Sequence, residues 1–336
     1  MTSILSRSMS TAFDRLSKGM RGVWPTMITP FKDGAKTVDW EMVDSLAEWY
    51  VKSGSAGIFS VCLSSEFYQL TNDERLAIAS RVHERVAGRV PVVASGTFGG
   101  PIEKQAEFMR EMAKRVDAVV IVTNQLAGKD ESDEKWLENA GKLLSLTGDI
   151  PLGFYESPVP YLRLLTPKML QWAVSSGRFY FHKDGSPNRN QLTAKIEAAA
   201  SAAAPLNHAF SMYTAKAYLI KDCLDHGGCG FSGISANFYP WMHAWLCENY
   251  RDEKAKTVQH FLGVADNVIR QTYPRSAKIY LNRFYGLPIT PACRIHDVEP
   301  IEEELTKIEF AYNMMEDFCR RLGIPMFSPK TLDQVQ

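Results

Sequence analysis

The stretch Leu152–Lys183 reads LGFYESPVPYLRLLTPKMLQWAVSSGRFYFHK, and the order of elements within it decides the expected fold. A short apolar run at Leu152–Tyr155 predicts a strand. The pair Thr166 and Pro167 predicts the start of a helix, because proline suits the first helical position. A second apolar run at Phe179–Lys183 predicts the next strand. A strand, a helix and a strand in this order are typical of a parallel sheet with crossover helices.

The same alternation extends over most of the chain. Amphipathic stretches separate the strands: apolar residues repeat at helical spacing from Trp40 to Val51, and Thr71 with Glu74 forms a capping box. The predicted strands are Gly22–Thr29, Gly57–Cys62, Pro91–Ser95, Ala118–Thr123, Leu152–Tyr155, Phe179–Lys183, His208–Ser211 and Gly228–Ser232. Eight strands close a barrel, so the expected fold is an α/β class (β/α)8 TIM barrel with a C-terminal helical domain.

Three parts of the chain are expected. Residues 1–21 form an N-terminal extension, residues 22–237 the catalytic barrel, and residues 238–336 the C-terminal helical domain. The basic and serine-rich composition of the extension also suits an organelle transit peptide, although a frayed or docking helix is favoured. After residue 236 the strand signals cease, and helices are predicted at about 239–250, 252–272 and 300–322.

Composition narrows the class of partner. The chain has 38 basic and 38 acidic residues, so no net charge favours a nucleic acid, and a small molecule is the expected partner. Its six cysteines form no CxxC pair, which indicates reduced thiols and a cytoplasmic location. No apolar run approaches the roughly 20 residues that span a bilayer, so we expect no membrane partner.

The first candidate for chemistry is a lysine at the end of a predicted strand, because barrel enzymes carry catalytic groups at the C-terminal strand ends. Alternation along the strand places Phe179, Phe181 and Lys183 on one face. Desolvation between aromatic side chains lowers the pKa of a lysine, and a neutral amine can attack a ketone to form an imine. A lysine that simply reaches solvent is the alternative interpretation.

Two further groups lie at neighbouring strand ends. Tyr155 ends the strand before that of Lys183, and because adjacent parallel strands lie about 4.8 Å apart, its hydroxyl could transfer protons at the same substrate atom. Ser64 and Ser65, with Leu63, could offer hydroxyls and backbone amides to a carboxylate. An ordinary packed tyrosine and a serine-rich turn are the alternative interpretations.

Several stretches together resemble the dihydrodipicolinate synthase and N-acetylneuraminate lyase family of Schiff-base-forming class I aldolases. The similarity covers nearly the whole chain from Gly22 onward, and its motifs occur in the order of the family. The matching stretches are Gly22–Gly34, Phe154–Pro158, Lys183 with Asp184, and Gly230–Asn237.

The resemblance implies a lyase in which Lys183 forms the Schiff base and Tyr155 is the proton-transferring phenol. It implies that Ser64 and nearby amides hold the carboxylate of a 2-oxo acid such as pyruvate. It also implies a homotetramer built as a dimer of dimers. The remaining expected substrate-binding residues are Leu63, Ser65, Glu156, Ser186 and Ser232.

Three departures from the synthases of this family narrow the function. Leu63 replaces the threonine that relays protons, and Gln125 with Leu126 replaces a tyrosine pair. Pro160 stands where those synthases have an arginine that grips the carboxylate of the second substrate, although Arg163 follows three residues later. Loss of a bidentate carboxylate partner is not a conservative change. A lysine-biosynthetic synthase is therefore disfavoured.

Polar residues near the barrel mouth suit a hydroxylated 2-oxo acid, namely Glu156, Gln125, Ser186 and Asn188. The expected function is aldol cleavage of such an acid with release of pyruvate. Dehydration of a 2-keto-3-deoxy sugar acid is the first alternative, and dihydrodipicolinate synthesis is the next. A catalytically inactive barrel that binds a 2-oxo acid is the non-enzyme alternative, because fold does not guarantee function.

A metal site is a further alternative, because His182 and Asp184 flank Lys183, and His208 and His226 lie on later elements. No spacing among these residues resembles a ligand set. Alternation turns His182 toward the surrounding helices when Lys183 faces inward. We therefore expect no metal and no cofactor.

Overall fold

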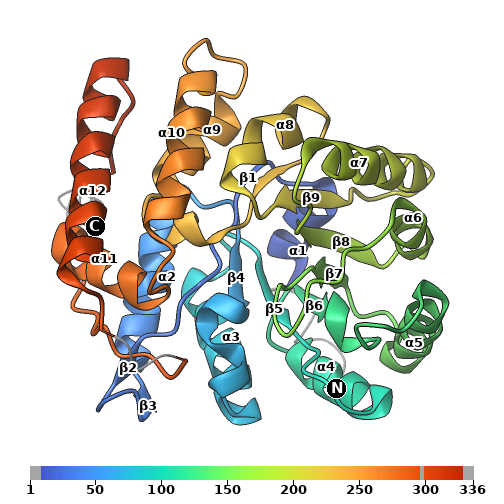
Figure 1. Ribbon diagram of the computed structural model, residues 1–336. Helices are drawn as coiled ribbons and strands as arrows, with labels where there is room; N and C mark the ends of the chain where they lie inside the picture. The colour runs from blue at the N-terminus through green and yellow to red at the C-terminus, as the bar shows by residue number, and fades with distance from the viewer. Residues whose placement is uncertain (1–8, 296–298, 328–336) are drawn as a thin grey trace.

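The centre of the molecule is a parallel eight-stranded sheet in the order β1-β10-β9-β8-β7-β6-β5-β4 (Figure 1). The computed structural model describes residues 9–295 and 299–327. The strands are Gly22–Val23 (β1), Ile58–Val61 (β4), Val92–Ser95 (β5), Ala118–Val122 (β6), Leu152–Tyr155 (β7), Phe179–Asp184 (β8), Ser211–Thr214 (β9) and Gly230–Phe231 (β10).

The two ends of this sheet meet, so the sheet closes on itself. The backbone N–H of Ala56 donates to the carbonyl of Val23 at 2.9 Å. The N–H of Phe59 donates to the carbonyl of Pro25, and the N–H of Met27 donates to the carbonyl of Phe59, both at 3.0 Å. A closed ring of parallel strands linked by helices is a (β/α)8 barrel, so the predicted fold class is confirmed.

Helices α2 to α9 surround the barrel (Figure 1). The capping box is present at the start of α3, because the hydroxyl of Thr71 accepts from the N–H of Glu74 at 3.1 Å. Thr166 caps α6 ahead of Pro167, as predicted. The helices are Trp40–Lys52 (α2), Asn72–Val86 (α3), Ile102–Met112 (α4), Asp133–Thr147 (α5), Pro167–Ser175 (α6), Arg189–Ala203 (α7), Ile220–Asp225 (α8) and Pro240–Glu248 (α9).

The last helix of this ring bears on where the barrel ends. α9 packs against β1, β10 and α8, which is the position of the helix that follows the eighth barrel strand. We therefore propose that the barrel ends after Glu248, later than the predicted boundary at residue 237. Beside it stand α10 (Ala255–Val268), α11 (Arg275–Tyr285) and α12 (Glu302–Leu322) (Figure 1).

One helix and one hairpin were not predicted. The buried face of α11 includes Arg275 and Lys278, so charged residues interrupt the apolar periodicity that would have indicated a helix. The antiparallel pair β2 (Phe31–Lys32) and β3 (Thr37–Val38) is too short to show an alternating pattern. Within residues 9–295 and 299–327, no helix is long and apolar enough to cross a membrane.

Two strand predictions are corrected by the structure. β9 covers Ser211–Thr214, whereas His208–Ser211 was predicted. The N–H of Ala209 donates to the carbonyl of Ser17 at 2.7 Å, so this segment pairs with the N-terminal part of the chain before β9 begins. The first strand is also shorter than the predicted Gly22–Thr29, because regular pairing with β10 ends at Val23.

The helix α1 (Met9–Lys18) docks at the N-terminal ends of the strands, as the favoured interpretation expected. The ring of Phe13 contacts that of Tyr180 at a centroid distance of 5.1 Å, and Leu16 is fully buried. The carbonyl of Ser17 accepts the hydrogen bond from Ala209 described above. α1 therefore lies at the end of the barrel opposite to the expected catalytic mouth.

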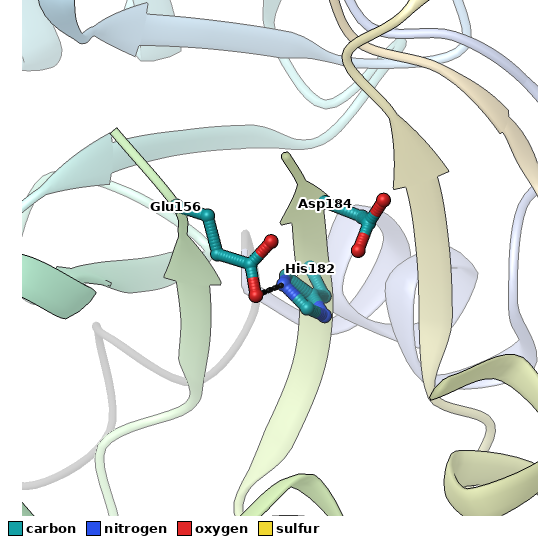
Figure 2. Close-up of side chains that lie close together, drawn as sticks. All are labelled: Glu156, His182 and Asp184. Carbon is teal, nitrogen blue, oxygen red and sulfur yellow. Dashed lines mark ion pairs between the residues drawn. The ribbon is translucent and has the colours of Figure 1, made fainter. Parts of the chain in front are cut away.

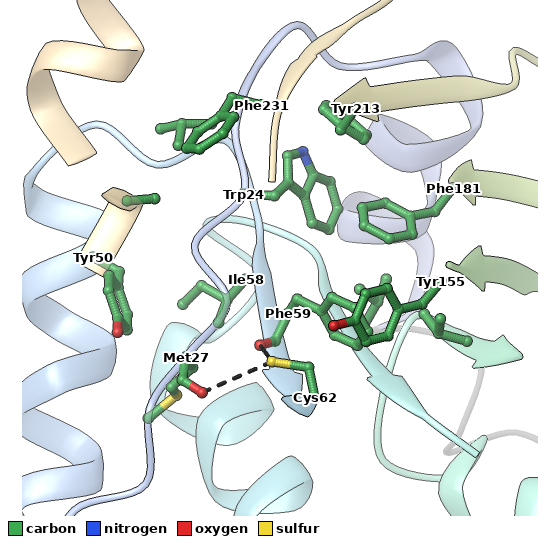
Figure 3. Close-up of a cluster of buried hydrophobic side chains, with 14 of the residues drawn as sticks. Trp24, Met27, Tyr50, Ile58, Phe59, Cys62, Tyr155, Phe181, Tyr213 and Phe231 are labelled. Atoms are coloured by element: carbon green, nitrogen blue, oxygen red, sulfur yellow. Dashed lines mark hydrogen bonds between the residues drawn. The ribbon is translucent and has the colours of Figure 1, made fainter. Parts of the chain in front are cut away.

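An aromatic cluster fills the barrel interior (Figure 3). The ring of Phe181 lies 5.0 Å from Trp24, 5.8 Å from Phe59 and 5.3 Å from Tyr213, measured between centroids. All four side chains are fully buried. Tyr155 packs on Phe59 at 5.5 Å, so the cluster forms the floor beneath the C-terminal strand ends.

Phe179 does not join this cluster, although alternation predicted it on the face of Lys183. The register between β7 and β8 shifts, because Leu152 pairs with Phe179 while the next residue, Gly153, pairs with Phe181. An irregularity of this kind reverses the alternation of side chains at one point of a strand. Phe179 accordingly stacks on Phe154 at 4.2 Å, outside the barrel interior.

A buried ion pair joins the C-terminal helices to the mouth of the barrel. Nζ of Lys278 on α11 lies 3.1 Å from Oε1 of Glu66, and both side chains are fully buried. The other carboxylate oxygen of Glu66 accepts from the backbone N–H of Ile295 at 2.9 Å and also from that of Arg294. Since Glu66 closely follows Ser64, this pair connects α11 to the loop after β4.

Replacement of one partner should destabilise the fold strongly. In Lys278→Met the Glu66 carboxylate stays buried without its counter-ion, and we expect a loss of about 3–5 kcal/mol in the free energy of unfolding. Denaturant titration measures this loss, and the double variant Glu66→Gln/Lys278→Met should recover part of it. The control Lys307→Met breaks the exposed pair with Glu303 and should change little. Equal losses in Lys278→Met and the control would contradict the prediction.

Candidate active site

A cavity of about 320 Å³ opens at the C-terminal ends of the strands, where the sequence analysis expected the chemistry. Its walls come from the loops after β4, β7, β8, β9 and β10 and from the segment between α10 and α11. The lining residues that carry chemistry are Leu63, Ser64, Tyr155, Lys183, Lys216, Gly233, Arg270 and Tyr273.

The structure brings the two expected catalytic residues together. Tyr155 and Lys183 are partners in the register of β7 and β8. Nζ of Lys183 lies 4.3 Å from the centroid of the Tyr155 ring. Both residues line the cavity, and their exposed fractions are only 5% for Lys183 and 3% for Tyr155. A small substrate in the cavity can therefore reach the amine and the phenol at once.

The environment of Lys183 favours its neutral form. Burial lowers its pKa to about 8, and the positive charge of Lys216 acts in the same direction. With this pKa, roughly one amine in ten is neutral at pH 7, against fewer than about one in a thousand for an exposed lysine. The Lys183 amine is thus available as a nucleophile near neutral pH.

The phenol of Tyr155 is held in its protonated form. Burial raises the pKa of Tyr155 well above its usual value, with the nearby Cys62 acting in the same direction. A neutral phenol beside the lysine amine can donate a proton to a substrate oxygen. Once it has given up this proton, the resulting phenolate can accept a proton from the substrate.

A polar cluster lies on the side of the cavity formed by the loop after β4. Oγ of Ser64 donates to Oγ1 of Thr26 at 3.0 Å, and Ser64 is also hydrogen-bonded to the hydroxyl of Tyr273. That hydroxyl accepts from Nδ2 of Asn237 at 2.8 Å. Tyr273 was not predicted, because it lies far along the chain from Lys183 and belongs to no motif.

Ser65, which was predicted to bind substrate, instead holds the loop in place. Its hydroxyl lies 2.7 Å from the carbonyl oxygen of Met27 and 2.9 Å from that of Ser60, and it accepts from the N–H of Cys62 at 3.0 Å. The side chain is fully buried beneath the cavity floor. Leu63 does line the cavity, as predicted.

The carboxylate of Glu156, which was predicted to contact substrate and which lines the cavity, is held by other groups of the protein. One oxygen accepts from the N–H of Leu165 at 2.7 Å and from Nζ of Lys195 at 2.6 Å. The other accepts from the N–H of Gly185 at 2.6 Å. Since both oxygens already have close donors, this carboxylate orders the loops after β7 and β8.

Ser186, Ser232 and Asn188 are likewise placed away from the cavity. Oγ of Ser186 donates to the Asp184 carboxylate at 2.8 Å, and the side chain of Asn188 caps α7. Ser232 is fully buried, and its hydroxyl has no hydrogen-bond partner among the described residues. The backbone of the neighbouring Gly233 lines the cavity, whereas Ser186 and Ser232 do not, and their substrate contacts stay predictions.

Glu156, His182 and Asp184 form a buried cluster (Figure 2), in which one possible ligand atom of each residue lies within 4.8 Å of the other two. Lys195 of α7 contacts both carboxylates, at 2.6 Å for Glu156 and 2.9 Å for Asp184. Although burial alone would raise it, the charges of Lys195 and His182 hold the pKa of Glu156 at about 2. The ammonium of Lys195 thus supplies the positive charge that these carboxylates require, and the absence of a metal stays a prediction.

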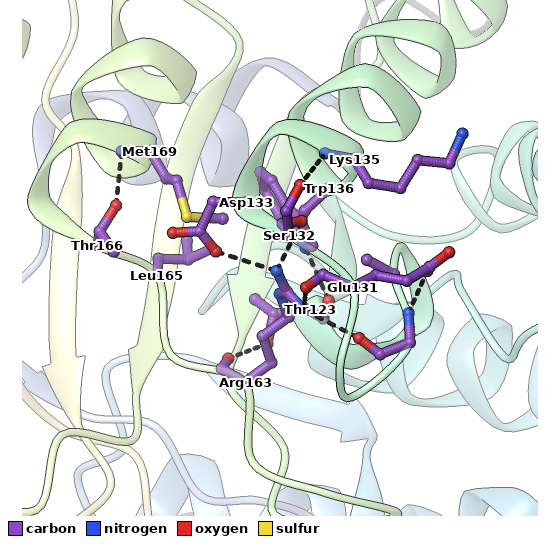
Figure 4. Close-up of polar contacts among 12 residues, drawn as sticks. Thr123, Glu131, Ser132, Asp133, Lys135, Trp136, Arg163, Leu165, Thr166 and Met169 are labelled. Carbon is purple, nitrogen blue, oxygen red and sulfur yellow. Dashed lines mark hydrogen bonds and ion pairs between the residues drawn. The ribbon is translucent and has the colours of Figure 1, made fainter.

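Arg163 is committed to the loop before α5 (Figure 4). Its guanidinium donates to the carbonyls of Gly128, Glu131 and Ser132 and to the carboxylate of Asp133, each at 3.0 Å. Arg163 does not line the cavity. It therefore does not take over the role of the arginine that Pro160 replaces.

Comparisons with known proteins agree with this architecture. A family model described as the dihydrodipicolinate synthetase family matches residues 19–127. A relative named 4-hydroxy-tetrahydrodipicolinate synthase, from Clostridium novyi (strain NT), is 25% identical over 269 residues. The match covers 78% of this chain and 86% of the relative.

Solved structures show the same fold. A prophage protein of the dihydrodipicolinic acid synthase family from E. coli K12, solved in complex with pyruvate, is 21% identical with a TM-score of 0.75. It covers 89% of this chain and 98% of its own. A dihydrodipicolinate synthase from Thermotoga maritima is 21% identical with a TM-score of 0.76 and the same two shares of 89% and 98%.

Proposed function

The chain belongs to the dihydrodipicolinate synthetase family, and we propose from this premise that it is a lyase that cleaves a hydroxylated 2-oxo acid and releases pyruvate. The observation that carries the proposal is the placement of Lys183 and Tyr155. Nζ of Lys183 lies 4.3 Å from the Tyr155 ring in a cavity of about 320 Å³. Burial lowers the pKa of that lysine to about 8.

The proposed reaction begins with the neutral amine of Lys183. The amine adds to the keto carbon, and loss of water gives a protonated imine. Tyr155, as phenolate after its proton has left with that water, accepts the proton of the C4 hydroxyl while the bond between C3 and C4 breaks. The electrons move to the imine nitrogen, an aldehyde leaves, and an enamine remains. Protonation of the enamine and hydrolysis then release pyruvate and restore Lys183.

The 2-oxo acid carboxylate is assigned to the loop after β4. Ser64 lines the cavity, and its hydroxyl belongs to the cluster with Thr26 and Tyr273. Backbone N–H groups of a loop such as Leu63–Ser64 are suited to a carboxylate. This assignment leaves the keto carbon free to face Lys183.

Two features disfavour the synthase reaction of the curated relatives. Leu63 occupies the position of the relay threonine, so its side chain offers no proton. Arg163 is bound to loop carbonyls, so its guanidinium is not available to hold the carboxylate of the second substrate. Cleavage therefore ranks first, with dehydration of a 2-keto-3-deoxy sugar acid next.

Product analysis separates these reactions. With a 2-keto-3-deoxy sugar acid as substrate, we expect pyruvate and an aldehyde in equal amounts, detected by mass spectrometry. A dehydratase would instead give a product lighter by one water and no pyruvate. With pyruvate and aspartate semialdehyde, we expect turnover far below the typical enzyme value of about ten per second. Turnover near that value would overturn the ranking in favour of the synthase.

The pH dependence of imine formation tests the state of Lys183. Since only the neutral amine attacks, the initial rate with pyruvate should rise about tenfold from pH 7 to pH 9 and then level off, as a group with pKa near 8 requires. Timed samples would be reduced with borohydride at one fixed pH and the adduct measured by mass. A rate that continues to rise about tenfold per pH unit up to pH 10 would show an unperturbed lysine.

The oligomeric state and the non-enzyme alternative also need tests. The resemblance supports a homotetramer, which light scattering of the purified protein would test. A binding protein without catalysis is the remaining alternative, and it would form no adduct on Lys183 with any 2-oxo acid.

A further inference from the structure

The charged side chains around the cavity are unbalanced. Lys183, Lys216 and Arg270 all line it. The one acidic residue among the lining residues is Glu156, and its carboxylate is bound to Lys195 and to the backbone N–H groups of Leu165 and Gly185. Among the described residues that line the cavity, no carboxylate is therefore left to neutralise these positive charges, and the cavity should attract anions.

Lys216 is one source of this positive charge. It lies two residues after the end of β9, it is half-buried, and its ammonium makes no ion pair among the described residues. Lys216 and Lys183 both line the cavity, and the positive charge of Lys216 lowers the pKa of Lys183. Burial of an unpaired ammonium costs free energy, so a bound anion would satisfy it.

Arg270 approaches the cavity from the C-terminal segment. Its side chain is about half exposed, at 51%, and one of its nitrogens is paired with Asp266. The other guanidinium donors make no hydrogen bond to the described residues. A guanidinium has five donors, so Arg270 keeps donors for a ligand while the pair with Asp266 orients it.

We propose that Lys216 and Arg270 bind a second anionic group of the substrate, so that the substrate is a 2-oxo acid with a carboxylate or phosphate at its far end. This inference rests on the proposed function for the position of the first carboxylate. That carboxylate must lie beside the carbon bonded to Lys183, and Ser64 and the loop after β4 are assigned to it. Lys216 and Arg270 lie on other walls of the cavity, which are formed by the loop after β9 and by the segment between α10 and α11.

The cavity size agrees with this assignment. Its volume of about 320 Å³ lies at the small end of ligand sites, which range over about 300–1,000 Å³. A single small substrate can therefore span from the amine of Lys183 to the two cations. The two cations replace, from different elements, the carboxylate grip that the family's synthases have at the position of Pro160.

Pairs of ligands that differ only in the group at the far end test the proposed binding of a second anion. Calorimetry would compare 2-oxoglutarate with 2-oxopentanoate, which has the same chain with a methyl end, and 2-oxoadipate with 2-oxohexanoate. We expect each diacid to bind at least about tenfold more tightly, as a charge-assisted contact provides. The pair of 2-keto-3-deoxygluconate and its 6-phosphate measures the gain in affinity from a terminal phosphate, and comparison with the gain of each diacid over its monoacid shows which anion the site prefers.

Variants of the two cations test which residue causes the preference for diacids. Lys216→Gln should remove most of the preference by lowering the affinity for the diacid more than that for 2-oxopentanoate, and Arg270→Gln should act less because that side chain is more exposed to solvent. Lys221→Gln is the control, because Lys221 follows β9 as well but pairs with Asp225 outside the cavity. Neither affinity should change in this control.

Three outcomes would overturn the inference. They are equal binding of the matched ligands, no binding of any anion-bearing ligand, or an equal loss for both ligands in Lys216→Gln, which would assign Lys216 to the first carboxylate. Borohydride trapping with pyruvate is measured separately, because it tests the proposed lyase function. If trapping fails while the preference for the second anion persists, the proposed lyase function is wrong and the anion site stands.

Discussion

Lys183→Ala is expected to abolish adduct formation with pyruvate and borohydride. In the wild-type protein, reduction of the imine should leave a secondary amine, and peptide mapping should place the added mass on Lys183 alone. The physical reason is its lowered pKa, because burial brings the pKa to about 8. Lys195 is equally buried, but its ammonium is bound to two carboxylates and stays protonated.

Further variants distinguish loss of the Lys183 nucleophile from loss of the folded structure. Lys183→Arg should also fail, because a guanidinium stays charged and forms no imine. Lys221→Ala removes an exposed lysine outside the cavity and should keep full trapping. Circular dichroism and denaturant unfolding should show a folded barrel in all three variants. Added mass on another lysine, or trapping that survives in Lys183→Ala, would show that the assignment of the nucleophile is wrong.

Tyr155→Phe is expected to lower turnover about 10² to 10⁴-fold while the adduct on Lys183 still forms. The ring packs against Phe59 at 5.5 Å and beside Nζ of Lys183, and phenylalanine keeps both contacts. Only the hydroxyl is lost, and with it the group that exchanges protons with the substrate. Steady-state turnover and borohydride trapping measured on the same preparation distinguish the two effects.

Tyr180→Phe is the matched control for this variant. Tyr180 lies on β8 like Lys183, but its ring contacts Phe13 and His208 on the outside of the barrel. It does not line the cavity, so removal of its hydroxyl should leave turnover unchanged. If Tyr155→Phe turned over as fast as this control, Tyr155 would have no part in proton transfer.

The order of elements was predictable because it depends on local signals. Short apolar runs, the cap at Thr71 and the Thr166-Pro167 pair each act within a few residues, and together they indicated a closed parallel barrel. The rule that catalytic groups stand at C-terminal strand ends then selected Lys183 and Tyr155. Their proximity follows from the register of the adjacent parallel strands β7 and β8, in which Tyr155 and Lys183 are partners.

The irregularities of the fold were not predictable, because they depend on partners distant in sequence. The shift in register that turns Phe179 out of the barrel interior is set by β7 and β8 together. The late start of β9 reflects pairing of Ala209 with Ser17 near the N-terminus. α11 carries Lys278 on its buried face, and only the presence of Glu66 across the structure makes that burial acceptable.

The same division applies to the site. The lysine, the tyrosine and the loop at Leu63–Ser64 could be predicted from the sequence, because strand ends converge on one mouth whatever the details of packing. The contacts of Glu156 with Lys195 and backbone donors could be found only in the folded structure. The reason is that a buried polar group takes whichever partner the fold brings near, and residue type does not reveal that partner. For the same reason Lys216, which lines the cavity and whose ammonium has no ion pair among the described residues, could be proposed as a substrate contact only from the tertiary structure.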